Sequence, residues 1–124
     1  MVDIDTFQSI ADKIVDELPE GFFRKLNGGV LLIEESKLHA QSRPDAPLYI
    51  MGEYCFSSVG RSIKIYYGSF ERTYPNHNAE EVERELRKTI LHEFRHHLEG
   101  LSGTRELEIE DKHQINEYLR KHNL

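Results

Sequence analysis

Apolar residues recur at intervals of three and four along three stretches of the chain, which is the period of an amphipathic helix. The first stretch predicts a helix from residue 5 or 6 to residue 18, where Pro19 interrupts the pattern. The second predicts a long helix over residues 78–99, and the third predicts a last helix over residues 106–122. A short helical turn is predicted over residues 20–26.

Three shorter stretches have the composition of β-strands, and they cover residues 30–34, 48–56 and 61–67. Residues 57–60 between the last two predict a hairpin turn. Gly52 lies inside the second stretch, where a glycine indicates a bulge or the close approach of another segment. The order of helix, strands, helix and helix predicts an α+β fold, with a short mixed or antiparallel sheet packed against the helices.

The composition limits the kind of protein this is. We expect the 124 residues, 1–124, to form one domain, and the 31% charged and 38% hydrophobic residues are typical of a soluble globular protein. The net charge of −6 argues against a general nucleic-acid-binding surface, and no apolar run has the length of a membrane span. The N-terminus lacks the pattern of a secretory signal, and Cys55 is the only cysteine, so we expect a cytoplasmic protein without an internal disulfide.

One turn of the long predicted helix carries candidate catalytic chemistry. It contains His92-Glu93-x-x-His96, which is the HExxH pattern of zinc-dependent hydrolases. On a helix, His92 and His96 lie about 40° apart around the axis and about 6 Å apart along it, so both imidazoles can bind one tetrahedral Zn²⁺. Glu93 is rotated by about 100° from His92 and is placed to act as a general base toward a water on that ion. The alternative is a solvated helix surface rich in histidine and glutamate, without a metal.

The neighbouring histidine and the tyrosines are predicted to have other roles. His97 points about 140° away from His92, so we expect it to pack at the edge of the core. A tyrosine hydroxyl can stabilise an oxyanion, but tyrosines in and next to strands are more often packing residues. This applies to Tyr54, Tyr66, Tyr67 and Tyr74.

The chain resembles the minimal zincin-like metallopeptidase family of bacteria. The resemblance covers most of the chain and rests on five segments: LPEGFF (18–23), NGGV (27–30), LYIMGEY (48–54), IKIYYG (63–68) and TILHEFRHHLEG (89–100). It implies a zincin fold and a bound Zn²⁺. It also implies that His92 and His96 are metal ligands and that Glu93 is the base.

The third metal ligand departs from the family pattern. Many members carry HExxHxxGxxD, whereas here Glu99 stands at the glycine position and Ser102 at the position of the acid. A carboxylate from outside the helix can approach the ion from a new direction, and Gly103-x-x-Glu106 can replay the spacing from glycine to acid. Our order of preference is Glu106 first, Asp111 second, and then Glu108 and Glu99.

These features predict a zinc-dependent metallopeptidase that acts on a peptide or protein substrate. An extended substrate is expected to pair with the strand over residues 48–56 or the strand over residues 61–67. One alternative is a metal-stabilised binding module with little or no catalysis, whose fourth metal position is closed by a protein ligand. Another is a zinc hydrolase that acts on a substrate other than a peptide.

Overall fold

The computed structural model describes residues 1–103 and 109–121. The elements in that range are α1 (Ile4–Asp16), the 3-10 helix η1 (Glu20–Phe23), β1 (Gly29–Ile33), β2 (Gly52–Ser57), β3 (Gly60–Tyr66), α2 (Tyr67–Thr73), α3 (Ala79–Gly103) and α4 (Ile109–Lys121). This is the α+β fold that the sequence predicts. None of the described helices is long and apolar enough to cross a membrane.

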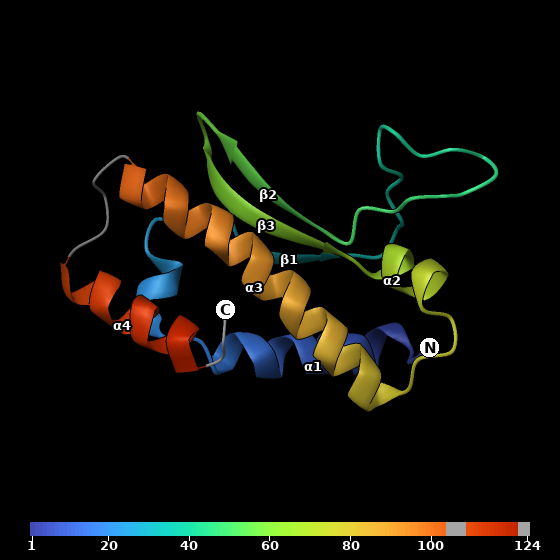
Figure 1. Cartoon of the computed structure of the whole chain (residues 1–124), viewed down its shortest axis with the longest axis horizontal. Helices are drawn as coiled ribbons and strands as arrows, with labels where there is room; N and C mark the ends of the chain where they lie inside the picture. The colour runs from blue at the N-terminus through green and yellow to red at the C-terminus, as the bar shows by residue number, and fades with distance from the viewer. Residues whose placement is uncertain (104–108, 122–124) are drawn as a thin grey trace.

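The three strands form one mixed sheet in the order β1-β3-β2. β1 runs parallel to β3, and β2 pairs with β3 in an antiparallel hairpin. Residues of β3 alternate along the strand: Ile63 and Ile65 are buried, whereas Ser62 and Lys64 are only half-buried. The sheet therefore packs one face on the helices: α3 crosses the molecule beside β2 and β3, and α1 lies near β1 (Figure 1).

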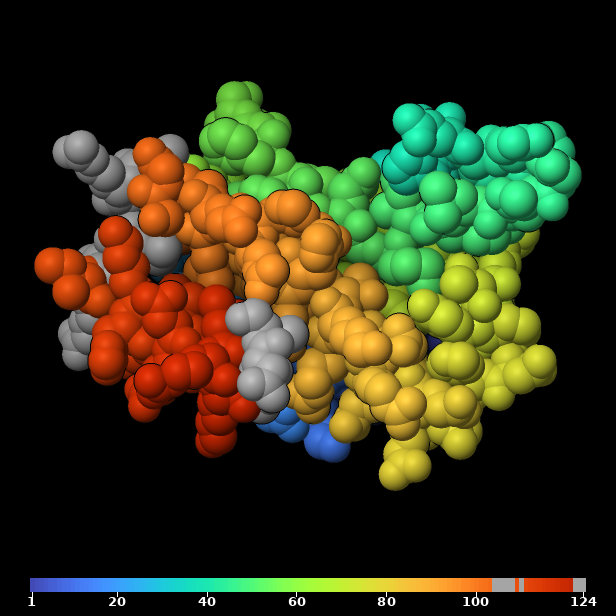
Figure 2. Space-filling model, viewed as in Figure 1, coloured from blue at the N-terminus to red at the C-terminus, as the bar shows by residue number. Residues whose placement is uncertain are grey.

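The apolar stripes predicted for the helices form the core, as expected. Phe7, Ala11 and Ile14 of α1 are buried, and they belong to one core cluster with residues of the long helix α3. The buried residues of α3 include the whole apolar stripe predicted for it, namely Val82, Leu86, Ile90, Leu91, Phe94 and Leu98. Because one side of α3 packs in the core, its opposite side faces the solvent and the end of the sheet (Figure 2).

Caps fix where the helices begin. Asn78 caps α3: the Glu81 N–H donates to its Oδ1 at 2.9 Å, and its own N–H donates to Oε1 of Glu81 at 3.0 Å. α1 begins at Ile4, ahead of the predicted start at residue 5 or 6, because the Asp3 carboxylate accepts the N–H of Thr6 at 2.8 Å.

Other features also differ from the sequence-based prediction. α3 continues through Gly100 to Gly103, so Gly100 does not end the helix. β2 begins at Gly52, because residues 48–51 fold back on residues 37–39, where the Ile50 N–H donates to the Lys37 carbonyl at 2.8 Å. α2 lies between the predicted strand over residues 61–67 and the predicted long helix, where the sequence predicts no helix.

Candidate active site

His92 and His96 lie on the exposed side of α3, one turn apart. Their Nε2 atoms are 3.1 Å apart, and the planes of the two rings are perpendicular. Two nitrogens bound to one tetrahedral zinc at 2.0–2.1 Å lie about 3.3 Å apart. The two imidazoles therefore fit a shared zinc ion, although the same separation also suits a hydrogen bond between the rings.

Glu93 is buried beneath β2, with only 7% of its surface exposed. A Cβ atom on Gly52 would lie 2.8 Å from Cγ2 of Thr89 and 3.1 Å from Cγ of Glu93, so the strand can approach the helix this closely only with glycine. This is the close approach that the sequence indicates for Gly52. Burial raises the pKa of the Glu93 carboxyl, against the opposing effects of His92, His96 and a hydrogen bond from the Tyr54 backbone. A raised pKa makes the carboxylate a better proton acceptor.

β2 presents an outer edge to this part of α3. Tyr66 donates its N–H to the Met51 carbonyl at 2.9 Å. This bond fixes which residue pairs of β2 and β3 exchange backbone hydrogen bonds. By the alternation of an antiparallel ladder, the backbone groups of Gly52, Tyr54 and Phe56 point away from β3, and that of Tyr54 bonds to Glu93. No further strand covers that edge in the described part of the chain. β3 lies between β1 and β2, so the strand over residues 61–67 cannot offer an edge to a substrate.

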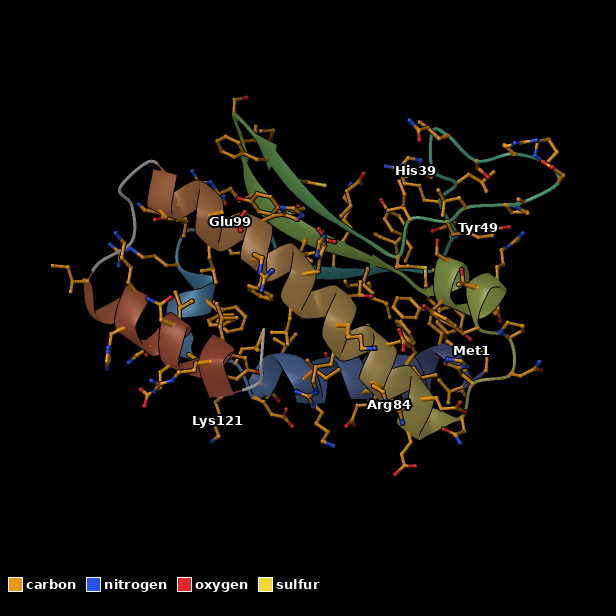
Figure 3. All side chains as sticks on the ribbon, in the orientation of Figure 1. Met1, His39, Tyr49, Arg84, Glu99 and Lys121 are labelled. Carbon is orange, nitrogen blue, oxygen red and sulfur yellow. The ribbon has the colours of Figure 1, made fainter. Side chains whose placement is uncertain are left out.

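A groove of about 460 Å³ opens beside His92. One wall comes from α3 and the other from the loop that precedes β2, where His39 and Tyr49 are located (Figure 3). The lining residues are His39, Leu48, Tyr49, Ile50, Met51, Gly52, Lys88, Thr89, His92 and Glu93. On its other side, toward α4, His92 borders a smaller hollow of about 120 Å³ that Lys88 also lines.

His97 has no exposed surface and belongs to the core, as the helical geometry predicts. Its Nε2 lies 2.8 Å from the Arg24 carbonyl oxygen, which can only accept a hydrogen bond, so this nitrogen carries the proton. Its Nδ1 therefore accepts the hydroxyl of Tyr54 at 3.0 Å. With both nitrogens engaged, His97 joins α3 to β2 and to the turn after η1.

The candidates for a third metal ligand are only partly covered by the structure. Glu106 and Glu108 lie outside the described residues, so the first choice stays a prediction. The Asp111 carboxylate is 3.6 Å from the Arg24 guanidinium, and Glu99 is exposed near the last turn of α3 (Figure 3). Among the described residues, no third histidine, cysteine or carboxylate joins His92 and His96.

The four tyrosines considered as oxyanion stabilisers make other contacts. Tyr54 donates to His97, Tyr66 to Glu53 at 2.9 Å and Tyr67 to the Val2 carbonyl at 2.7 Å, while Tyr74 contacts Glu85 at 3.4 Å. None of these four lines the groove at His92.

The groove residues His39, Tyr49 and Lys88 are not singled out by the sequence analysis. Lys88 precedes His92 by four residues, and this spacing alone places it on the same helix face. His39 and Tyr49 reach the site only through the tertiary fold, so no local pattern marks them.

An HExxH helix packed beneath a small mixed sheet with an open edge strand defines a zincin-like fold. A family model described as zincin-like metallopeptidase matches residues 30–114, and the chain belongs to this family. The structure is similar to the solved structure of a conserved hypothetical protein from T. thermophilus, with 32% identity and a TM-score of 0.71. That match covers 82% of this chain and 99% of the other. A search of curated proteins found no match.

Proposed function

We propose that the protein is a zinc-dependent peptidase in which His92 and His96 bind the metal and Glu93 is the general base. The observation that carries this proposal is the convergence of the two Nε2 atoms, 3.1 Å apart, next to a buried carboxylate. Membership of the zincin-like metallopeptidase family supports the same class of chemistry. Glu106 is our first choice for a third ligand.

The protein residues divide the work between binding and proton transfer. His92 and His96 bind as neutral imidazoles through Nε2, which leaves the proton of each ring on Nδ1. When bound, zinc supplies a Lewis acid that polarises a carbonyl and lowers the pKa of water. Glu93 takes the proton of the attacking water and passes it to the nitrogen of the leaving amine, so its carboxylate is regenerated when the peptide bond breaks.

The outer edge of β2 supports a peptide as the substrate. The backbone groups of Gly52 and Phe56 point away from β3, and an extended peptide can pair with them as an added strand. Gly52 lies directly against the helix turn that contains Glu93, so a peptide paired there passes beside the general base. A substrate without a peptide backbone cannot form these hydrogen bonds with the edge of β2.

Replacement of Glu93 by glutamine tests the proposed function. Glutamine keeps the shape and the hydrogen bonding of the side chain but cannot accept a proton at neutral pH. We expect Glu93→Gln to retain zinc and to lose about 10²–10⁴-fold in the rate of peptide hydrolysis. Cleavage of a diverse peptide pool, followed by mass spectrometry with a chelator control, measures this loss.

Glu80→Gln provides the matched control, because Glu80 is exposed in the first turn of the same helix. It should cleave the pool as the wild type does. Equal cleavage by wild type and Glu93→Gln contradicts the mechanism. A wild type that holds zinc and cleaves no peptide instead supports the binding-module alternative.

A further inference from the structure

We propose that the groove beside His92 binds a carboxylate of the peptide substrate, with Lys88 and His39 as its hydrogen-bond donors. This inference rests on the proposed function and names a chemical feature of its substrate. Lys88 and His39 lie on opposite walls of the same groove of about 460 Å³. The carboxylate can come from an acidic side chain or from the C-terminus of the peptide, since both present the same group.

Lys88 supplies the positive charge. It lies one helical turn before His92 and lines the spaces on both sides of that histidine. Its ammonium group is 3.5 Å from a Glu85 carboxylate oxygen, and 65% of its side chain is exposed. So long and solvated an ion pair holds the side chain weakly, so the charge can turn to a ligand in the groove.

His39 supplies a neutral N–H donor. The backbone N–H of Gln41 donates to Nδ1 of His39 at 3.0 Å, so this nitrogen carries no proton. The proton of the neutral ring is therefore on Nε2, which becomes a donor. His39 is exposed on the loop that forms the wall opposite α3 (Figure 3).

The rest of the lining offers little that would favour a cation. Leu48, Ile50 and Met51 are apolar, and the Thr89 hydroxyl donates to the Glu85 carbonyl at 3.1 Å. Glu93 is the one acid among the described residues that line the groove, and it is buried as the base. A ligand group that fits these walls must accept hydrogen bonds and carry negative charge, and a carboxylate does both.

The direction of β2 indicates which part of the peptide meets this groove. Gly52 lies against Thr89 and Glu93, and Tyr54, two residues further along β2, contacts His97. β2 and α3 therefore run in the same direction here. Antiparallel pairing is the more stable mode at a strand edge. A peptide paired antiparallel to β2 therefore enters the groove with the residues that follow the scissile bond.

Peptide binding to the zinc-loaded Glu93→Gln protein tests this inference without any turnover. Four otherwise identical pentapeptides carry glutamate or glutamine at the fourth position and a free or amidated C-terminus. Isothermal titration calorimetry should give about threefold to tenfold tighter binding for the peptide with the carboxylate that the groove takes. The four peptides identify whether that group is the side chain or the terminus. The preference should weaken as salt is raised, because the contact is partly exposed.

Three further substitutions, each added to Glu93→Gln, assign the preference to the groove. Lys88→Met should abolish most of it, and Lys88→Glu should reverse it in favour of an amidated peptide with lysine at the fourth position. Arg84→Met is the matched control, since Arg84 is an exposed cation nearer the start of α3 and does not line the groove (Figure 3). It should keep the preference. His39→Phe should reduce it, and His39→Gln, which retains a donor, should restore part of it.

The result that overturns the inference is equal affinity for all four peptides, absence of binding by any of them, or a preference that Lys88→Met leaves intact. Its failure is separable from failure of the proposed function. A wild type that cleaves peptides without a carboxylate preference refutes only the inference. A carboxylate preference in binding, with no cleavage by wild type, refutes only the peptidase.

Discussion

Three histidines fall within six residues of α3 and meet two different environments. His92 and His96 are exposed and converge on each other, whereas His97 is fully buried between Tyr54 and the Arg24 carbonyl. The positions on the helix follow from its 3.6-residue period, so the sequence alone predicts which rings face outward. The partners of His97 lie 43 and 73 residues away along the chain, and no local pattern identifies them.

The bond between Tyr54 and His97 gives a test at this scale. We expect Tyr54→Phe to lower the free energy of unfolding by about 1–3 kcal/mol, because it removes the donor to Nδ1 of a fully buried ring. Urea denaturation in the presence of a chelator measures this loss without a contribution from metal binding. Tyr49→Phe is the control, since Tyr49 lies half-exposed in the groove, and it should change the stability by less than about 0.5 kcal/mol. Equal stability of Tyr54→Phe and the wild type contradicts the role given to this bond.

The elements that the sequence predicts well are those with a strong internal period. α3 is defined by its apolar stripe and by the Asn78 cap, both of which are local signals. α2 is missed because its sequence, YGSFERT, has low helix propensity and its N-cap Tyr66 makes no side-chain capping bond. The helix forms because Phe70 and its neighbours are buried against the rest of the fold, which is a tertiary effect.

Alanine substitution of two glycines tests the helices α3 and α2, and the expected changes in the free energy of unfolding have opposite signs. A Cβ on Gly100 would meet nothing within 4 Å, so Gly100→Ala should raise the free energy of unfolding by about 0.5–1 kcal/mol if the helix passes through it. A Cβ on Gly68 would lie 2.5 Å from the Ser36 nitrogen and 2.8 Å from the Glu35 carbonyl carbon. Gly68→Ala should therefore lower it by about 1–3 kcal/mol. Thermal and urea unfolding measure both, and a destabilised Gly100→Ala would restore the predicted helix end.

The loop that forms one wall of the groove is anchored by charge. Lys37 donates to both carboxylate oxygens of Glu53 at 2.9 and 2.8 Å, and Tyr66 donates to one of them. The bond from Lys37 is the main cause that holds the pKa of Glu53 below its usual value of 4.5, against the effect of burial. Contacts of this kind join residues 16 positions apart and are not visible as a sequence pattern.

This anchor makes part of the stability dependent on pH. Because the pKa of Glu53 is lower in the folded chain, its ionisation stabilises the fold above pH 4.5, and this contribution is lost as the pH falls through the folded pKa. We expect Glu53→Gln to be less stable than the wild type at pH 7, with the difference shrinking below pH 4.5. Urea unfolding from pH 7 to pH 3 measures it. Glu35→Gln, at an exposed loop position, should show no such dependence, and a constant Glu53→Gln difference across that range would refute the linkage.

At the scale of the whole molecule, the α+β class, the helix that carries the motif and the family resemblance all follow from the sequence. The groove does not, because it forms where a loop, an edge strand and a helix meet. The chain carries a net charge of −6, yet Lys88 and two histidines border this groove. Glu93 lines the same groove, and only the fold brings these side chains together.

The zinc content of the purified protein tests the central claim most directly. Elemental analysis after mild dialysis should give about one zinc per chain for the wild type and for His113→Ala, whose ring is exposed on α4. The double variant His92→Ala, His96→Ala should retain none, because both imidazoles that converge on the ion are gone. Undiminished zinc in that double variant would contradict the account, since the metal would then be held elsewhere.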